Sequence, residues 1–421
     1  MRKVIAIPFL VLLATIAHGQ GTWSTLNIPS SARYDDIYFV NDSVGWAAGG
    51  PTGWIRKTVN GGATWNLQFT SPSYLRSIEF INADTGFCGS LNGELYRTHN
   101  GGTTWIDESG SITPSPPGIC GLSAPTSNTI YGTGLWASPA YVVKSTDGGD
   151  SWSYIDMSAY ATALVDIHFI SADTGFVTGT ASPASDGGII LYTTDGGATW
   201  QPKHLTGLAS DIVWKIQRLD ADRWYASVYS EPVNDDTRLL SSTDGGQTWI
   251  TTIVSNSYTY VEVVGFLDSL RGWIGGDNSL WGTTDGGASW SQEPVGSNYN
   301  RFFRLNDSLA YMSGARIYKY TVDAPTAITP SEPVPQYHAL VVEPKITDGR
   351  VNISIRLDRS TIADLSLFGS DGALVEQLLR RVAMQGEHRF TIDLSRYAGG
   401  TFFVVLKTNE GMMYKKVVLS R

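Results

Sequence analysis

The chain has 421 residues, of which 39 are acidic and 30 basic, so its formal net charge at pH 7 is −9. An acidic chain of this kind is a poor partner for nucleic acid or for an anionic membrane surface, and we expect it to bind neither. Only the N-terminus holds a long apolar run, so no later segment is expected to cross a membrane.

Residues 1–19 have the organisation of a signal peptide. An Arg-Lys pair precedes an apolar run over residues 4–16, which is too short to span a bilayer. The small residues of "AHG" then allow cleavage before Gln20. The alternative interpretation of this run is a buried first strand.

Seven copies of one pattern, here called the template, follow between residues 37 and 311. Each copy has an apolar strand, a turn rich in Asp, Ser and Gly, and an aromatic residue, as in "DIYFVNDSVGW" and "SIEFINADTGF". The apolar residue precedes the aromatic one by nine positions in every copy. The pairs are Ile37 and Trp46, Ile78 and Phe87, Leu122 and Tyr131, Ile167 and Phe176, Ile216 and Tyr225, Val264 and Trp273, and Phe302 and Tyr311. Such regular recurrence indicates a repeat architecture.

Six copies of a second motif, of the form "STDGGQTW", alternate with the template. Their tryptophans are 40, 47, 48, 49 and 41 residues apart. The carboxylate can accept hydrogen bonds from nearby backbone N–H groups, and the two glycines can adopt positive φ. The indole can pack between neighbouring repeats. Asn replaces Asp in two copies, which a turn tolerates and a catalytic acid would not. We therefore expect a scaffold role for Asn60, Trp65, Asn100, Trp105, Asp147, Trp152, Asp195, Trp200, Asp244, Trp249, Asp285 and Trp290.

Each repeat is expected to fold as four short antiparallel strands, A to D, so the chain should be all-β. Seven units predict a seven-bladed β-propeller over residues 20–321. The last unit stops at "ARIYKYT" and lacks strand D, whereas the mature N-terminus, "GTWSTLNIP", resembles one. Trp23 lies 14 residues before Ile37, close to the 13 that separate Trp65 from Ile78. We therefore expect Trp23–Ile28 to complete the seventh blade and close the ring.

The second motif resembles the Asp box of the bacterial neuraminidase repeat (BNR) families, whose pattern is Ser/Thr-x-Asp-x-Gly-x-Thr-Trp. The spacing and the element "NADTGF" are most similar to the propellers of the photosystem II assembly and stability factor family. This resemblance covers residues 21–321 and implies the fold. It leaves activity open, because sialidases, sortilin-type receptors and xyloglucanases share the same repeats.

Residues 322–336, "VDAPTAITPSEPVPQ", are expected to be a Pro-rich linker. Composition changes across it, because all 14 Trp precede it and residues 337–421 hold 12 basic against 9 acidic side chains. Five short strands, "RVNISIRL", "DLSLFGS", "HRFTIDL", "GTFFVVLKT" and "YKKVVLS", predict a small β-sandwich over residues 337–421.

The C-terminal segment resembles the C-terminal sorting domain of the Bacteroidota type IX secretion system. The resemblance rests on "LSLFGSDGALVEQL", "LSRYAGGTFFVVL" and the terminal "YKKVVLSR". Phe402 and Phe403 stand where the family has Tyr, and the Asn-Pro opening is reduced to "VEPKITDG". The resemblance implies the type IX secretion machinery as a partner and a protein that is secreted or attached to the outer surface of the outer membrane. Removal of the domain and attachment to lipopolysaccharide stay open.

The two cysteines lie in neighbouring repeats, Cys88 in strand B of the second unit and Cys120 in strand A of the third. An exported protein could oxidise them to a disulfide. Two separate buried thiols are an equally good interpretation, because the sequence does not fix their Cα separation.

Loops on one face of the propeller are expected to carry function. The A–B and Asp-box turns share one face and are regular, whereas the D–A and B–C loops share the other face and vary most in units three to five. Length drift is the alternative explanation. Aromatic and charged side chains on that face and around the channel could bind a protein or a glycan. The alternative for each of these side chains is a role in packing or in solvation of the surface. The candidate ligand-binding residues are Asp36, Arg76, Trp136, Asp166, Trp214, Lys215, Tyr229, Glu262 and Arg301.

Signals for catalysis are weak. Arg76, Arg301 and Arg304 are scattered and do not form the arginine triad of a sialidase. The histidines lack ligand spacing, and no phosphate-binding loop or Gly-x-Ser-x-Gly motif is present, so we expect no metal and no cofactor. The sequence favours a monomeric, non-catalytic binding propeller. The alternative is a glycoside hydrolase of sialidase or xyloglucanase type that uses carboxylates among Asp36, Asp166 and Glu262.

Overall fold

The computed structural model describes residues 21–29, 33–230, 236–257, 260–322, 338–369, 374–397, 399–408 and 411–420. The predicted signal peptide and all but the first residue of the predicted linker lie outside these residues. The chain divides into two compact units, Met1–Ala324 and Pro325–Arg421.

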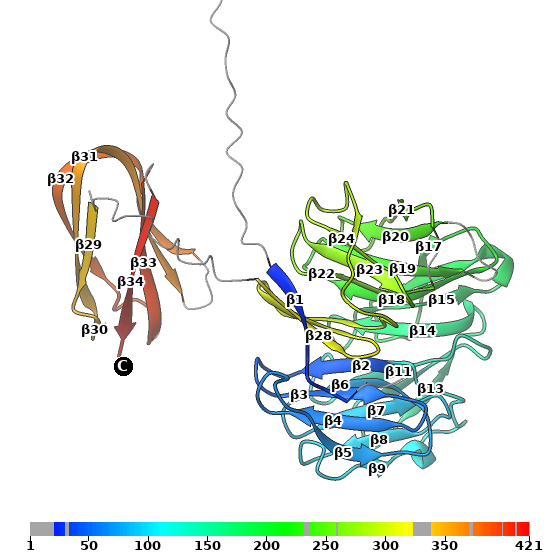
Figure 1. The fold of residues 1–421 in the computed structure, drawn as a ribbon. Coiled ribbons are helices and arrows are strands. Elements are labelled where there is room, and N and C mark those ends of the chain that lie inside the picture. The colour runs from blue at the N-terminus through cyan, green and yellow to red at the C-terminus, as the bar shows by residue number, and fades with distance from the viewer. Residues whose placement is uncertain are drawn as a thin grey trace, which may run out of the picture. The chain divides into compact units, whose positions relative to one another are not determined.

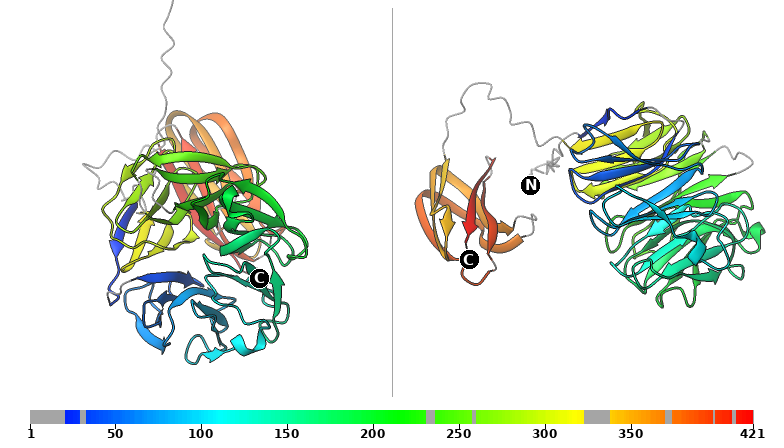
Figure 2. Two further views of the ribbon diagram at one scale, coloured as in Figure 1. Left: turned by 90° about the vertical axis from the view of Figure 1, so that its right-hand side faces the viewer. Right: turned by 90° about the horizontal axis from the view of Figure 1, so that it is seen from below.

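Seven four-stranded antiparallel sheets make up the first unit and stand as blades around an axis (Figures 1 and 2), so the predicted all-β, seven-bladed propeller is confirmed. Within blades 1 to 6 the strands follow one another in sequence from the axis outward. Blade 1 holds β2 (Tyr34–Phe39), β3 (Gly45–Gly49), β4 (Trp54–Thr58) and β5 (Asn66–Thr70). Blade 2 holds β6 (Leu75–Phe80), β7 (Gly86–Ser90), β8 (Leu95–Thr98) and β9 (Ile106–Asp107). Blade 3 holds β10 (Gly121–Ser123), β11 (Ile130–Thr133), β12 (Tyr141–Ser145) and β13 (Ser153–Asp156).

Blades 4 to 6 repeat the same order. Blade 4 holds β14 (Ala161–Phe169), β15 (Gly175–Ala181), β16 (Gly188–Thr193) and β17 (Gln201–Leu205). Blade 5 holds β18 (Asp211–Arg218), β19 (Trp224–Ser230), β20 (Thr237–Ser242) and β21 (Ile250–Ser255). Blade 6 holds β22 (Val261–Phe266), β23 (Gly272–Gly276), β24 (Leu280–Thr283) and β25 (Ser291–Gln292). Short 3-10 helices at Ser109–Ser111 and Ala184–Asp186 lie in loops between strands.

The seventh blade joins the two ends of the unit, as predicted. It holds β26 (Phe302–Asn306), β27 (Leu309–Ser313), β28 (Ile317–Val322) and, outermost, β1 (Gly21–Thr25) (Figure 1). Trp23 pairs with Tyr320 across the two strands and packs edge-on against Trp273, with ring centroids 5.1 Å apart. The strand is shorter than expected, but Ile28 beyond it is buried. The N-terminal strand therefore closes the ring.

The Asp-box turns share one hydrogen-bonding scheme, shown here for blade 5. The Asp244 carboxylate accepts bonds from the backbone N–H of Thr248 at 2.9 Å and from the hydroxyl of Ser242 at 2.8 Å. Trp249 donates its indole N–H to the carbonyl of Gly246 at 3.0 Å, a bond that recurs in the turns with Asp but not at Trp65 and Trp105 in the turns with Asn. Both glycines have positive φ in all six turns. These hydrogen bonds lower the pKa of the four aspartates to about 2; they are Asp147, Asp195, Asp244 and Asp285.

Lysines on the third strands link successive blades through the same turns. Lys57 donates to the carbonyl of Gly101 in the next blade at 2.8 Å, and Lys144 donates to the carbonyl of Gly196 at 2.9 Å. Lys319 repeats this bond across the closing seam, to the carbonyl of Gly61 in blade 1 at 3.2 Å. The turn thus stabilises the contact between blades as well as its own hairpin.

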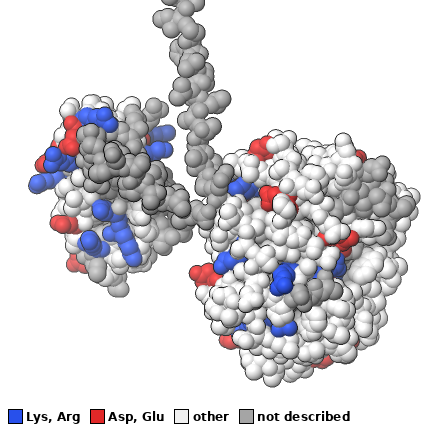
Figure 3. Space-filling model, in the orientation of Figure 1, with Lys and Arg blue, Asp and Glu red and all other residues white. Residues whose placement is uncertain are grey.

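The C-terminal unit is one six-stranded sheet that closes around an apolar core. Its strands are β29 (His338–Glu343), β30 (Ile346–Thr347), β31 (Arg350–Gly369), β32 (Leu374–Asp393), β33 (Gly400–Thr408) and β34 (Gly411–Leu419). The segments predicted as separate strands before and after residue 360 form the single strand β31, which arches together with β32 (Figure 1). Its first half pairs with β29 and its second half with β33. On the face in Figure 3 this unit carries many basic side chains, whereas the propeller surface is mostly uncharged.

Candidate functional site

The template residues mark equivalent positions on the seven innermost strands. The residue directly before each one belongs to a ring around the channel, and the ring consists of Asp36, Ser77, Gly121, Asp166, Lys215, Val263 and Arg301. A side chain at Gly121 would bring a Cβ to 3.0 Å from the Cα of Asp166, which shows how closely the inner strands approach. Four of the seven positions carry charge.

Those four charged residues, here called the floor, form a network across the channel. Arg301 donates to Asp36 at 3.0 Å and to the two carboxylate oxygens of Asp166 at 2.9 and 3.2 Å. The ammonium of Lys215 lies 3.7 Å from Asp166. Burial alone would raise the pKa of Asp166, but Arg301 and Lys215 hold it below its ordinary value, whereas burial and Arg301 lower the pKa of Lys215 to about 8.

Both floor carboxylates also bind the backbone of the next blade. Asp36 accepts from the N–H of Ile78 at 3.0 Å, and Asp166 accepts from the N–H of Ile216 at 3.0 Å. Each carboxylate therefore has a cation and a backbone donor, which is what a buried charge requires. The floor fixes the spacing of blades on opposite sides of the ring.

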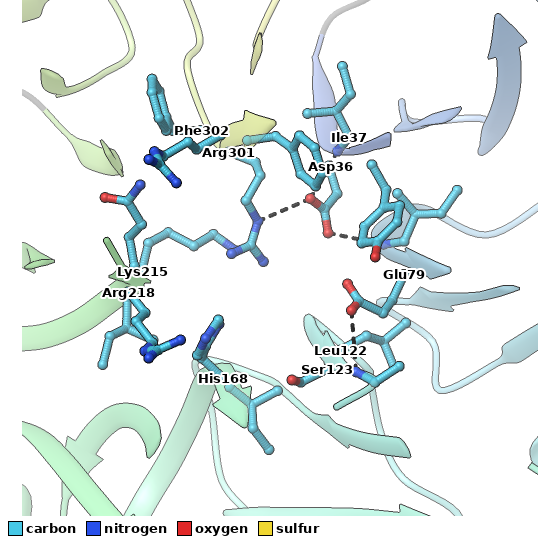
Figure 4. Close-up of a pocket in the computed structure, with 18 of the residues that line it drawn as sticks. Asp36, Ile37, Glu79, Leu122, Ser123, His168, Lys215, Arg218, Arg301 and Phe302 are labelled. Carbon is cyan, nitrogen blue, oxygen red and sulfur yellow. Dashed lines mark hydrogen bonds and ion pairs between the residues drawn. The ribbon is translucent and has the colours of Figure 1, made fainter. Parts of the chain in front are cut away.

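A cavity of about 300 Å³ opens on one side of the floor. Its lining comes from the second halves of the inner strands, which run toward the A–B turns, so it lies toward the Asp-box face. Glu79, Ser123, His168, Arg218 and Arg301 surround it in Figure 4.

The cavity wall holds two titratable groups that are neutral at pH 7. Burial raises the pKa of Glu79 to about 8, although the N–H of Ala124 donates to this carboxyl group at 3.3 Å. Burial lowers the pKa of His168 to about 4, and its ring packs edge-on against Trp224 at 5.4 Å. Neither group was expected to contribute to a site.

On the other side of the floor, β-bulges turn side chains toward the loop-rich face, and the residues at these bulges are here called the bulge layer. The pairing of inner strands with their neighbours shifts at Asp35, Arg76, Trp214 and Glu262. A bulge leaves one residue unpaired and re-aims its side chain. Arg76 forms an ion pair with Asp35 and lies 5.6 Å above the ring of Trp214. Arg33 binds both Asp35 and Glu262.

Four neighbouring aromatic rings, here called the aromatic row, cross the loop-rich face. Trp136 packs against Trp214 with centroids 5.9 Å apart, Trp214 against Tyr229 at 4.9 Å, and Tyr229 against Tyr260 at 5.7 Å. Trp214 is buried and Tyr229 partly buried, whereas Trp136 is 43% and Tyr260 38% exposed. The row spans loops and strands of blades 3, 5 and 6.

The structure divides the nine predicted ligand-binding residues into three groups. Asp36, Asp166, Lys215 and Arg301 form the floor, Arg76 and Glu262 lie in the bulge layer, and Trp136, Trp214 and Tyr229 belong to the aromatic row. They do not meet on one surface, and their role in binding stays a prediction. Sequence reasoning missed Glu79, His168 and Arg218, although they sit one or two positions after template residues.

The two cysteines are free and buried. Of the alternatives left open by the sequence, the structure has two separate thiols, and burial raises the pKa of both. Within the described residues, no group of three His, Cys, Asp or Glu side chains is placed to hold a metal ion. No helix in the same part of the chain has the length and apolar character needed to cross a bilayer.

The fold and the turns together define an Asp-box β-propeller that carries a second, C-terminal β-sheet unit. Residues 149–257 match the family model of the photosynthesis system II assembly factor YCF48, which supports the BNR propeller family for these repeats. A search of curated proteins gave no match.

Solved structures share the fold at low identity. YCF48 bound to a D1 peptide is 17% identical, with a TM-score of 0.54, over 72% of this chain and 97% of that one. YCF48 from Cyanidioschyzon merolae is 17% identical, with a TM-score of 0.53, over 71% of this chain and 98% of that one. PorZ of Porphyromonas gingivalis, described as an essential bacterial surface component of the type-IX secretion system, is 12% identical, with a TM-score of 0.54, over 93% of this chain and 60% of that one.

Proposed function

We propose that the protein is a non-catalytic binding propeller, exported to the cell surface, that holds a protein segment on its loop-rich face. The aromatic row carries this proposal, because its two end rings, Trp136 and Tyr260, are exposed beside the buried Trp214 and the partly buried Tyr229. Aromatic side chains anchored in this way are the usual hot spots of protein interfaces. The descriptions of YCF48 as bound to a D1 peptide and of PorZ as a surface component support the same function.

The geometry of the row favours a protein over a glycan. Trp214 and Tyr229 are stacked at 28°, and the contacts at the two ends of the row are tilted at 34° and 36°, so each inner ring is flanked by two aromatic neighbours. A sugar ring stacks on an open aromatic face, which only the ends of the row could offer. Ring edges and tyrosine hydroxyls suit a peptide chain, which offers both apolar side chains and backbone hydrogen bonds.

The carboxylates argue against hydrolysis. A glycoside hydrolase needs two carboxyl groups free to reach the substrate. Asp36 and Asp166 are shared by Arg301 and bound by backbone N–H groups, while Glu262 is bound by Arg33 and Asn300. The groups that the alternative would use are therefore already engaged.

Screening the mature chain against a peptide library and a glycan array tests the binding proposal. Peptides enriched by the wild type should be lost from Trp136→Ala, with affinity reduced about tenfold or more. Leu205→Ala, an equally exposed residue (43%) on the outer strand β17, should bind as the wild type does. Enrichment of glycans alone would contradict the protein ligand. Turnover of sialosides or xyloglucan that Asp166→Asn abolishes would establish the hydrolase instead.

The C-terminal unit is proposed to direct export through the type IX machinery. Deleting residues 338–421 should then leave the propeller folded but retained inside the cell envelope. Fractionation and surface labelling of intact cells would measure this. Equal surface exposure of the truncated chain would show that the unit serves another purpose.

A further inference from the structure

The polar groups of the cavity on the Asp-box side of the floor have no role in binding at the aromatic row. The cavity's hydrogen-bond acceptors are already engaged, because the carboxylates of Asp36 and Asp166 bind Arg301 and the backbone. Its donors are not. Arg218 makes no hydrogen bond or ion pair within the described residues, and its buried Nε has no partner.

Other donors surround the same space. The neutral carboxyl group of Glu79 presents an O–H, and the hydroxyl of Ser123, which accepts from the N–H of Phe169, still has its own proton to donate. Figure 4 places Glu79, Ser123, His168 and Arg218 around the same hollow as Arg301. A pocket with a guanidinium that has no partner, beside a carboxyl and a hydroxyl that can donate, suits a ligand that offers acceptors.

We propose that this cavity binds a small organic acid through its carboxylate, with Arg218 as the principal anchor. The charges specify the class of anion. Arg301 and Lys215 are neutralised by Asp36 and Asp166, so Arg218 is left as the uncompensated cation and matches a single negative charge. A guanidinium fork binds a carboxylate through two parallel hydrogen bonds. A phosphate dianion would bring a second charge toward the floor carboxylates.

The size of the space restricts the ligand further. A volume of about 300 Å³ is at the lower end for a ligand pocket, which excludes a folded partner and long polymers from the interior. Tyr38 and Phe303 contribute aromatic wall beside the polar groups. An acid with a compact ring or a short hydroxylated chain fits both kinds of wall.

Calorimetric titration of the full mature chain in a carboxylate-free buffer tests the proposal, with benzoate and gluconate as probes. At least one should bind with 1:1 stoichiometry, and benzamide, which lacks the charge, should bind at least tenfold more weakly than benzoate. Arg218→Met should weaken binding at least tenfold. Arg223→Met is the matched control, because Arg223 pairs with Asp220 on the same face outside the cavity, and it should bind as the wild type does.

The pH dependence provides a second readout that a merely structural role of Arg218 would not produce. Glu79 faces Asp36 and Tyr38 of β2, Asp166 and His168 of β14, Lys215 and Arg218 of β18, and Arg301. Ionisation of Glu79 near pH 8 would place an anion beside the ligand, so affinity should fall as the pH rises from 7 to 9. Lys215, whose pKa is also about 8, loses its charge over the same range and adds to the fall. Glu79→Gln keeps a donor and should bind at pH 7, with a smaller fall than the wild type shows.

The outcomes separate this proposal from the loop-face function. Failure of both acids to bind, unchanged binding by Arg218→Met in a variant that still melts cooperatively, or phosphate binding as tightly as the acids would each overturn it. Trp136→Ala should leave acid binding unchanged, so each site can fail without the other.

Discussion

Arg301 is the side chain on which the floor depends. It precedes the innermost strand of blade 7 and reaches carboxylates from blades 1 and 4, so one guanidinium compensates two buried charges. Removing one member of a buried ion network is costly because the remaining charges lose their partner while staying out of water.

Replacing Arg301 by Met should therefore lower the free energy of unfolding by about 3–5 kcal/mol. The triple variant Arg301→Met, Asp36→Asn and Asp166→Asn should recover most of that loss, since it removes the unpaired charges as well. Urea denaturation at pH 7 measures both. Arg223→Met, which breaks an exposed pair, should stay within about 0.5 kcal/mol of the wild type. A loss of similar size in the single and triple variants would contradict the charge explanation.

Glu79 makes stability depend on pH in a defined direction. Its pKa in the folded chain is about 8 against an ordinary value of 4.5, because burial disfavours the charged form. A raised pKa contributes stability that is complete below pH 4.5 and is lost as the pH rises to about 8. Relative to Glu79→Gln, the wild type should thus lose stability between pH 5 and pH 8 and then level off. Denaturation midpoints across this range would show a flat difference if Glu79 were ionised throughout.

The Asp-box turn is the element that recurs most regularly, and its tolerance for change follows from its bonds. Asn60 and Asn100 keep the side-chain oxygen that accepts the backbone N–H of Thr64 and Thr104, both at 2.9 Å. The second glycine of the turn tolerates substitution less well than the Asp. A Cβ at Gly246 would lie 2.6 Å from the buried ring of Phe176, and φ there is +81°.

Among blade 5 variants, Gly246→Ala should be the most harmful, at about 2–4 kcal/mol of lost stability from backbone strain and overpacking. Gly245→Ala is the matched control, since φ is also positive but the closest atom, a carbonyl oxygen, lies 3.2 Å away, and it should cost about 1 kcal/mol. Asp244→Asn should cost less than either. Thermal unfolding at pH 7 ranks the three, and a loss from Asp244→Asn equal to that from Gly246→Ala would give the carboxylate a role beyond the turn.

The sequence predicted the blades well because the template has a fixed nine-residue interval, and that interval depends on one hairpin. It predicted the site less well. Asp35 and Asp36 are neighbours, yet the bulge at Asp35 places one in the bulge layer and the other in the floor. A bulge depends on pairing between two strands, which no local pattern reveals. Glu79 and Arg218 lie one and two positions after template residues, so the sequence could have placed them on the inner strands. Their importance depends on burial and on missing hydrogen-bond partners, which only the three-dimensional structure shows.

Closure by β1 makes the propeller a single cooperative ring rather than an open array. Trp23 contributes the apolar part of that seam through Trp273, Tyr320 and Phe302. Strand pairing with β28 contributes the rest and covers an edge that would otherwise be free to join another chain.

Trp23→Ala should therefore lower the free energy of unfolding by about 3–5 kcal/mol. Deleting residues 21–25 should in addition broaden the unfolding transition and produce soluble aggregates, because β28 becomes an exposed edge. Denaturation and size-exclusion chromatography follow the two effects. Leu205→Ala, on the outer strand of blade 4, should change neither, and a monomeric, sharply melting deletion variant would contradict closure by this strand.

The pairing of Gly21 with Val322 brings the entry and exit of the propeller to neighbouring positions. Because the blades form a closed ring, the fold does not require the chain to begin in one particular blade. New termini could be opened in an exposed loop between two blades and the old ones joined by a short peptide, which would yield circular permutants with the same seven blades. A fold of this kind can also be inserted into a loop of another protein, because its two connections leave side by side.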